Sequence, residues 1–468
     1  MVFSSIVFLW VLLPIILICY YICPYLKARN FLLVIFSLFF YAWGEPKYIV
    51  LMLLSVLVNY VFGILIERGR KKGLLLAVCA ALNLLILGYF KYFHFLAETW
   101  NGFIKSDAFK VSEVSVALPI GISFYTFQAL SYVVDVYRGD NRAQKNFLNM
   151  VLYISFFPQL IAGPIVKYHD IEMQIEKRTV TAESFSYGIK RFILGMGKKV
   201  ILANTFAQIV DKVYDYQPWN VARPLLWMTA ILYMLQIYFD FSGYSDMAIG
   251  LGKMFGFTFQ ENFRLPYTAV SIRDFWRRWH ISLSSWFREY VYIPLGGNRK
   301  GKMRTYLNLT AVFLLTGFWH GAGWTFIVWG IYHGFFNILE RCLLDKWMGR
   351  GRWHVMEHIY TLLVVLIGWV LFRAPTLTYG LQYIKGMFVP HEAVLRVERF
   401  LDLKTMMFLA AGILGSGIIQ NILARKQIRF AEDGDISFIG IAGYMAVMWF
   451  SVILLVNNTY NPFIYFRF

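Results

Sequence analysis

Long apolar stretches run along almost the whole chain, and short loops rich in Lys and Arg separate them. A helix needs about 20 apolar residues to cross the hydrocarbon core of a bilayer. The pattern therefore predicts an all-α polytopic membrane protein with about 11 or 12 transmembrane helices. The expected spans are residues 3–24, 31–43, 47–66, 73–90, 115–136, 184–206, 222–240, 305–318, 322–340, 355–373, 403–421 and 437–456.

Two regions do not follow this pattern. Residues 147–166 are apolar, but Pro158 and the Gly163-Pro164 pair interrupt them. We expect a re-entrant hairpin there, because irregular backbone at membrane depth must be buried in protein or line a cavity. Residues 240–304 are too polar for lipid and too aromatic for a free loop. This segment predicts one or two amphipathic helices at the cytoplasmic interface, with arginines toward phosphates and headgroups.

Composition supports the membrane class. The 468 residues are 59% hydrophobic and 15% charged, whereas a soluble domain carries about 25% charged residues. No linker rich in Ser, Gly or Pro divides the chain, so residues 1–468 are expected to form a single membrane domain. The four cysteines lie in or beside apolar stretches without zinc-ligand spacing, which is typical of packing residues.

The net charge of +18 is best explained by membrane topology. Most Lys and Arg lie in short loops, and basic loops stay on the cytoplasmic side, so no nucleic-acid partner is expected. Counting crossings from the basic loops places both termini outside, with residues 457–468 as an extracytoplasmic tail. The first apolar stretch lacks a basic n-region and a cleavage site, so we expect it to be a retained helix.

His320 is the strongest candidate for chemistry. It lies in the apolar sequence LLTGFWHGAGWTF between Gly317 and Gly321. Ionisable side chains at membrane depth are costly and mark functional sites, and the glycines leave room for a substrate or a second helix. A neutral imidazole is a suitable general base for a hydroxyl that attacks a thioester. The alternative from the residues alone is a histidine that hydrogen-bonds across a helix pair.

Other candidates are weaker when judged from the residues alone. His280 follows two arginines in WRRWHISLSSW, and its structural alternative is an interfacial histidine that faces headgroups. Asp240 and Asp246 are membrane-depth carboxylates, for which polar contact between helices is the alternative. The sequence from His354 to His358 matches H-x-x-E-H, but a third ligand is not apparent and no metal site is expected.

Several long motifs give the chain a strong resemblance to a known family. They are LPIGISFYTFQALSYVVDVYRG, FFPQLIAGPI, FDFSGYSDMAIGLGKMFGF, ENFRLPY, FWRRWHISLSSWFREYVYIPLGGNRKG and LLTGFWHGAGWTFIVWG. They resemble the membrane-bound O-acyltransferase (MBOAT) family, above all its branch of alginate and peptidoglycan O-acetyltransferase membrane components. The resemblance runs from the N-terminus to about residue 375. It implies the MBOAT fold, with helices around a central funnel or tunnel and residues 240–345 as the catalytic core.

The resemblance also implies roles and partners. His320 matches the family's catalytic histidine, and His280 matches the second histidine of this branch. The implied donor is a cytoplasmic thioester, acetyl-CoA or an acyl carrier protein, and no permanently bound cofactor is expected. An extracytoplasmic SGNH-type transferase would place the acetyl group on an alginate-like exopolysaccharide or on peptidoglycan, at a bacterial cytoplasmic membrane. Candidates to line the tunnel or face the donor are Asp240, Asp246, Trp276, Arg278, Trp279 and Trp324.

Two alternatives to this function stay open. Teichoic-acid D-alanylation uses related membrane proteins, and the C-terminal sequence F-x-Y-x-x-F resembles a terminal motif of such systems. The resemblance implies that Tyr465 carries the acyl group briefly, whereas the structural alternative is an aromatic anchor at the membrane interface. A protein without catalysis would be a transporter or flippase of an acylated carrier, with Asp240, Asp246 and Arg373 along its path.

Overall fold

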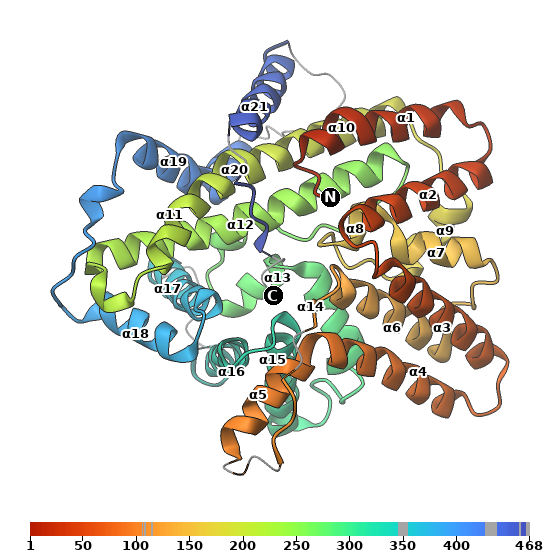
Figure 1. The fold of residues 1–468 in the computed structure, drawn as a ribbon, viewed down its shortest axis with the longest axis horizontal. Helices are drawn as coiled ribbons and strands as arrows, with labels where there is room; N and C mark the ends of the chain where they lie inside the picture. The colour runs from red at the N-terminus through yellow and green to blue at the C-terminus, as the bar shows by residue number, and fades with distance from the viewer. Residues whose placement is uncertain are drawn as a thin grey trace. The chain divides into compact units, whose positions relative to one another are not determined.

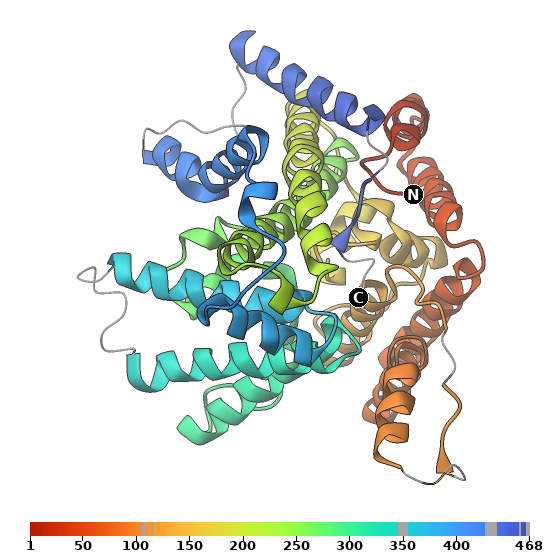
Figure 2. The same ribbon diagram turned by 60° about the vertical axis from the view of Figure 1, so that its left-hand side comes forward.

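Figures 1 and 2 show the computed structural model, which describes residues 1–104, 106, 109–113, 116–344, 354–425, 438–457 and 460–464. Within these residues the regular elements are helices. The described residues also contain isolated β-bridges, which join Val221 to Leu395 and Phe263 to Trp279. The all-α fold class predicted from the sequence is confirmed.

The chain divides into two compact units. One consists of Met1–Phe192 and Met247–Gln260, and the other of Ile193–Asp246 and Glu261–Phe468. Two of the three boundaries fall within helices, α10 (Ala182–Gly197) and α12 (Arg223–Met254), and the third follows Gln260 in a loop. The single membrane domain expected from the sequence stays a prediction.

The first unit is built from helices that polar contacts tie together. Asn59 and Asn83, on neighbouring helices, exchange amide hydrogen bonds of 3.0 Å in a buried interface. His169 lies 3.2 Å from the carboxylate of Asp135, and this contact raises the pKa of His169 to about 10. Such contacts hold apolar helices in register. In chain order the helices are α1 (Leu13–Ile22), α2 (Leu26–Gly44), α3 (Ile49–Arg68), α4 (Lys72–Leu87), α5 (Phe93–Phe103), α6 (Ile122–Arg138), α7 (Phe147–Ser155), α8 (Phe157–Leu160) and α9 (Tyr168–Glu176).

The interrupted segment at 147–166 is a broken pair of helices. Helix α7 ends where Phe156 leaves the helical conformation, α8 covers only one turn, and irregular backbone follows. Every residue from 150 to 166 is buried. This is the environment that irregular backbone requires at membrane depth.

The second unit holds both candidate histidines. After the short π-helical segment η4 (Lys198–Ala203), its helices run from α11 to α21 and include most of α12. They are α11 (Asn204–Tyr214), α13 (Ile272–Arg278), α14 (Ile281–Phe287), α15 (Gly301–His320), α16 (Trp324–Leu339), α17 (His354–Arg373), α18 (Leu377–Phe388), α19 (Leu403–Ile413), α20 (Ile419–Arg425) and α21 (Phe438–Asn457).

Seven helices in the described part of the chain are long and apolar enough to cross a membrane. The expected spans 115–136 and 322–340 correspond to α6 with 17 residues and α16 with 16 residues. Both are shorter than the about 20 residues that a full crossing requires. The seven longer ones are Leu26–Gly44, Ile49–Arg68, Lys72–Phe103, Arg223–Met254, His354–Arg373, Leu403–Ile422 and Phe438–Asn457, and Phe8–Ile22 is a shorter apolar helix.

Helix α12 corrects one sequence prediction. We expected a span at 222–240 followed by an interfacial segment, but α12 continues as one helix to Met254. In its most apolar window 89% of the residues are buried inside the protein, and a helix surrounded by protein tolerates polar side chains that lipid excludes. Asp240 and Asp246 therefore lie on a buried helix. The amphipathic segment shortens to α13 and α14, with seven residues each.

Candidate active site

Helices α15 and α16 form a closely packed hairpin next to His320. A Cβ atom at Gly317 would lie 2.3 Å from the backbone oxygen of Phe326. One at Gly330 would lie 2.4 Å from the backbone oxygen of Phe313. Larger residues would push the helices apart, so these glycines allow the two backbones to touch. His320 is the last residue of α15 and is 6% exposed, so the packing of the hairpin fixes the position of its imidazole.

Aromatic rings surround the imidazole of His320. The ring centroids of Trp319, Trp329 and Phe372 lie 4.9, 5.1 and 5.2 Å from that of His320. Trp329 belongs to α16 and Phe372 to α17, so three helices contribute to this shell. A shell of rings keeps water away, and electrostatic interactions are stronger in a medium of low dielectric constant.

His280 is positioned by its own backbone and by Asn262. It precedes α14 in a left-handed conformation, with φ 46° and ψ 54°, which is uncommon for a residue that has a Cβ. Its Nδ1 lies 3.1 Å from Oδ1 of Asn262. The same oxygen accepts hydrogen bonds from the backbone N–H and the hydroxyl of Ser282, at 3.2 and 2.9 Å. Asn262 could not be recognised from the sequence alone, because its partners lie many residues further along the chain.

The hydrogen bonds of Asn262 also decide which nitrogen of His280 carries the proton. The backbone N–H of Ser282 can only donate, so the Asn262 atom that it contacts is the oxygen. Nδ1 of His280 then donates to this oxygen, and the neutral ring keeps its lone pair on Nε2. Nε2 is buried without a hydrogen-bond partner among the described residues. It can therefore accept a hydrogen bond from a substrate.

The fold brings the two predicted histidines together. Their ring centroids lie 6.5 Å apart, and His280 is 1% exposed. Phe241 of α12 packs against the ring of His280 with centroids 4.7 Å apart, and Trp319 contacts both imidazoles. The sequence left this proximity open, because the histidines belong to elements that are far apart along the chain.

Two of the predicted tryptophans pack against aromatic residues of α16 and α17. Trp276 packs against Trp329 with ring centroids 5.6 Å apart. Trp279 packs against Trp369 of α17 at 4.8 Å. Through Trp329, which also contacts His320, the short helix α13 is joined to the site.

The remaining polar candidates lie in ion pairs. Arg278 pairs with Asp274 one turn earlier on α13, with 2.9 Å between Nε and Oδ1. Asp246 pairs with Lys198 at 2.6 Å. Trp324, the first residue of α16, is 50% exposed.

His333 is a third buried histidine, and it was not among the residues predicted from the sequence. It lies on α16 and is 0% exposed, with its ring 5.1 Å from Trp276 and 5.0 Å from Trp329. Neither ring nitrogen has a hydrogen-bond partner in the described part of the chain. His333 lies inside the expected span 322–340, and an ionisable residue at membrane depth is a feature by which it could have been recognised.

Asp240 forms a buried ion pair that holds the C-terminal segment. One carboxylate oxygen lies 2.6 Å from Nζ of Lys199, with side-chain exposures of 2% and 4%. The other oxygen accepts the backbone N–H of Ile464 at 2.8 Å. Lys199 also donates to the backbone oxygen of Pro462. The pair therefore binds backbone groups of Pro462 and Ile464.

Side chains add to this attachment. The hydroxyl of Tyr460 donates to Asp211, and Phe463 packs against Tyr244 with ring centroids 4.8 Å apart. Tyr465, the candidate acyl carrier, follows this anchored segment directly in the sequence and lies outside the described residues.

The structure offers no metal cluster in the residues that it describes, since no three His, Cys, Asp or Glu side chains gather closely enough to hold an ion. In the H-x-x-E-H match, Nδ1 of His358 donates to the backbone oxygen of Ala269 at 3.0 Å.

Comparison with known proteins decides the family. The profile described as "MBOAT, membrane-bound O-acyltransferase family" matches residues 76–381, which include both histidines of the site. The chain belongs to the membrane-bound O-acyltransferase family. This O-acyltransferase is 45% identical over 396 residues to "Probable alginate O-acetylase AlgI" of Pseudomonas putida, covering 83% of this chain and 80% of the relative.

Two further relatives mark the range of the family. The O-acyltransferase is 36% identical over 427 residues to "Peptidoglycan O-acetyltransferase" of Helicobacter pylori, covering 83% of this chain and 80% of the relative. "Teichoic acid D-alanyltransferase" of Bacillus subtilis is 28% identical over 264 residues, covering 53% and 65%. The protein is thus a multi-pass membrane enzyme that transfers acyl groups.

Proposed function

We propose that the enzyme passes an acetyl group from a cytoplasmic thioester donor across the bacterial cytoplasmic membrane, for O-acetylation of an extracytoplasmic polysaccharide. The acceptor is an alginate-like exopolysaccharide or peptidoglycan, and an SGNH-type partner completes the transfer. The names of the relatives support the acetyl group and the acceptor class. The observation that carries the proposal is the buried pair of His280 and His320, whose ring centroids lie 6.5 Å apart.

In the proposed reaction His320 is the general base. An acceptor hydroxyl gives its proton to His320, and its oxygen attacks the carbonyl carbon of the thioester. The C–S bond breaks as the C–O bond forms, and the imidazolium returns the proton to the leaving thiolate. General-base assistance contributes about 10²–10⁴-fold, so positioning of the two reactants contributes much of the remaining acceleration.

His280 would hold a reactant in place beside His320. Its Nε2 lone pair is buried and without a hydrogen-bond partner in the described residues, so it accepts an N–H or O–H of a bound reactant. A hydrogen bond of this kind orients the reactant in a site from which the aromatic rings exclude water.

Tyr465 is the proposed intermediate acceptor. The preceding residues 460–464 are anchored in the second unit through Asp240 and Lys199. A tyrosine hydroxyl can be acylated and can then pass the acetyl group to the partner. Tyr465→Phe tests this step separately from the anchor, because it keeps the ring and removes only the hydroxyl.

The first experiment replaces His320 with alanine and measures polymer acetylation in cells. We expect acetylation to fall by roughly 100-fold or more, because the general base is lost, while the variant still inserts into the membrane. His94→Ala, which removes an exposed histidine on α5, is the control and should acetylate normally. Acetylation at the wild-type level by the His320→Ala variant would refute the proposal.

Teichoic-acid D-alanylation is the second candidate. The relative with that name matches 53% of this chain, against 83% for the alginate and peptidoglycan relatives. Mass spectrometry of the modified polymer separates the two, because an acetyl and a D-alanyl ester differ in mass.

A further inference from the structure

The proposed reaction places a positive charge on a buried ring. His320 becomes an imidazolium when it takes the proton of the acceptor hydroxyl, and the residue is only 6% exposed. A charge that forms away from water is costly, because it loses the solvation that water would give it. The groups around this imidazole therefore help to determine the height of the barrier.

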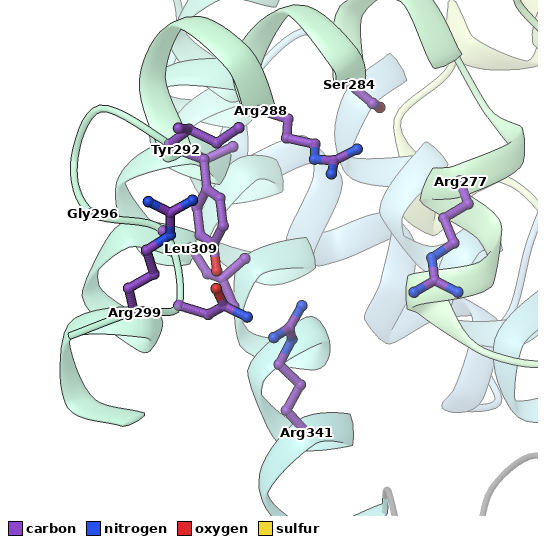
Figure 3. A pocket seen from close by; sticks show the side chains of 12 residues that line it. Arg277, Ser284, Arg288, Tyr292, Gly296, Arg299, Leu309 and Arg341 are labelled. Carbon is purple, nitrogen blue, oxygen red and sulfur yellow. The ribbon is translucent and has the colours of Figure 1, made fainter. Parts of the chain in front are cut away.

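A basic cavity beside α15 makes this charge harder to form. Figure 3 shows the guanidinium groups of four arginines around the cavity, whose volume is about 640 Å³. Val312 lines the cavity, and His320 ends the same helix. The rise along the helix from Val312 to His320 is roughly 12 Å. Positive charges repel each other over such a distance where water and salt screen them little. The arginines are Arg277, Arg288, Arg299 and Arg341.

Three aromatic rings lie close enough to His320 to act on a cation. The centroids of Trp319, Trp329 and Phe372 are 4.9, 5.1 and 5.2 Å from that of the imidazole, with interplanar angles of 73°, 85° and 80°. The electron-rich face of an aromatic ring attracts a cation within about 6 Å of the ring centroid. Together the three rings form an aromatic cage around the imidazole.

Trp329 is the member of this cage that the fold holds most firmly. It is 0% exposed, and its ring packs against Trp276 at 5.6 Å and stacks on Trp369 at 6.0 Å between centroids. These neighbours belong to α13 and α17. Among aromatic side chains, tryptophan attracts cations most strongly. The indole is therefore fixed beside His320 before any proton moves.

The cage acts on the charged form of His320 far more than on the neutral form. A neutral imidazole presents no net charge to the ring faces, whereas an imidazolium does. An interaction that strengthens as the charge develops lowers the barrier, because it stabilises the transition state more than the ground state. The attraction adds to any hydrogen bond that the imidazolium donates, and it is strongest where water is excluded.

We propose that Trp329, together with Trp319 and Phe372, stabilises the imidazolium of His320 through cation–π attraction. The inference rests on the proposed function, because the charge forms only if His320 takes a proton. Trp329 acts through His320 and not on the substrate itself. A useful test must therefore separate the stabilisation of charge from the packing of the indole.

The test replaces Trp329 with tryptophans that carry an increasing number of ring fluorines, introduced by nonsense suppression into the full-length protein in nanodiscs. Fluorine withdraws electron density from the ring face and changes the size of the ring little. With acetyl-CoA and a hydroxyl acceptor, the logarithm of kcat for thiol release should fall steadily with each fluorine. The total loss should reach roughly 30-fold, the value of a desolvated cation–π contact, with a smaller change in KM.

Ordinary substitutions give a second series. Trp329→Phe keeps a weaker aromatic face and should lower kcat by roughly 3- to 10-fold, whereas Trp329→Leu removes the face and should lower it by roughly 30-fold. The matched control is fluorination of Trp227 on α12, whose ring packs against Phe388 with centroids 5.4 Å apart. The control should keep the wild-type kcat.

The His320→Ala background separates charge from packing. No imidazolium forms at this position in that variant, so its residual rate should not depend on the fluorines at Trp329. The same fall of kcat in the His320→Ala background, or on fluorination of Trp227, would contradict the proposal.

Failure of this inference differs from failure of the proposed function. If thiol release depends on His320 but does not change along the fluorine series, the role of Trp329 is wrong and the proposed function stands. A wild type that releases no thiol would refute the proposed function and, with it, this inference.

Discussion

The orientation of the His280 imidazole depends on one amide side chain. Oδ1 of Asn262 accepts three hydrogen bonds, from His280 Nδ1 and from the backbone and hydroxyl of Ser282. Removing this acceptor leaves buried donors without a partner, which costs about 1–3 kcal/mol. The same change frees the ring of His280 to rotate, so Nε2 no longer points at a fixed place.

Asn262→Ala should therefore lower kcat by roughly 10- to 100-fold, with a smaller effect on KM. Asn262→Asp keeps the acceptor oxygen and replaces Nδ2, which has no hydrogen-bond partner among the described residues, with a second carboxylate oxygen, and the added negative charge faces the donor Nδ1 of His280. It should restore most of the activity. Steady-state kinetics on purified variants checks this, and equal losses of kcat in the two variants would contradict a positioning role.

At the residue scale the sequence identified only part of the site. His320 could be found because an ionisable side chain stands out in an apolar run. His280 followed from the resemblance, since its arginine-rich surroundings also fit an interfacial residue. Asn262 and Lys199 act through tertiary contacts, and local spacing carries no signal for such contacts.

Among the elements, the attachment of the C-terminal segment, residues 460–464, can be tested most easily. Lys199 and Asp240 form a buried ion pair, and both also bind backbone groups of that segment. Breaking a buried pair on one side leaves an uncompensated charge and costs about 3–5 kcal/mol, whereas replacing both partners with apolar residues is often neutral.

Lys199→Met should therefore lower the thermal unfolding temperature clearly. The double variant Lys199→Met with Asp240→Leu should recover most of that stability but keep a low acetylation rate, because the tail contacts are still missing. Lys198→Met breaks a more exposed pair with Asp246 and should change both quantities less. Normal acetylation in a stable double variant would show that the anchor is not needed.

Helix boundaries could be predicted where a helix must be apolar along its whole length to lie in lipid. The spans at 31–43, 47–66 and 355–373 coincide with α2, α3 and α17, because long apolar runs mark them. The prediction for α12 ended too early at 240, since this helix is buried in protein and need not be apolar throughout.

For the whole molecule, hydropathy predicted an all-helical membrane protein, and this is confirmed. Orientation of the termini and the single domain stay predictions. The proximity of His280 and His320 could not be read from periodicity, because it results from how α13, α14, α15 and α12 pack in the second unit.

The proposed function depends on the buried imidazole of His320 acting as the general base in acyl transfer. The most direct measurement supplies purified protein in nanodiscs with labelled acetyl-CoA and a hydroxyl acceptor, and follows the release of free thiol. We expect release by the wild type and a rate at least about 100-fold lower for His320→Ala. Equal rates for the two proteins, or transport of intact acetyl donor without any thiol release, would contradict it.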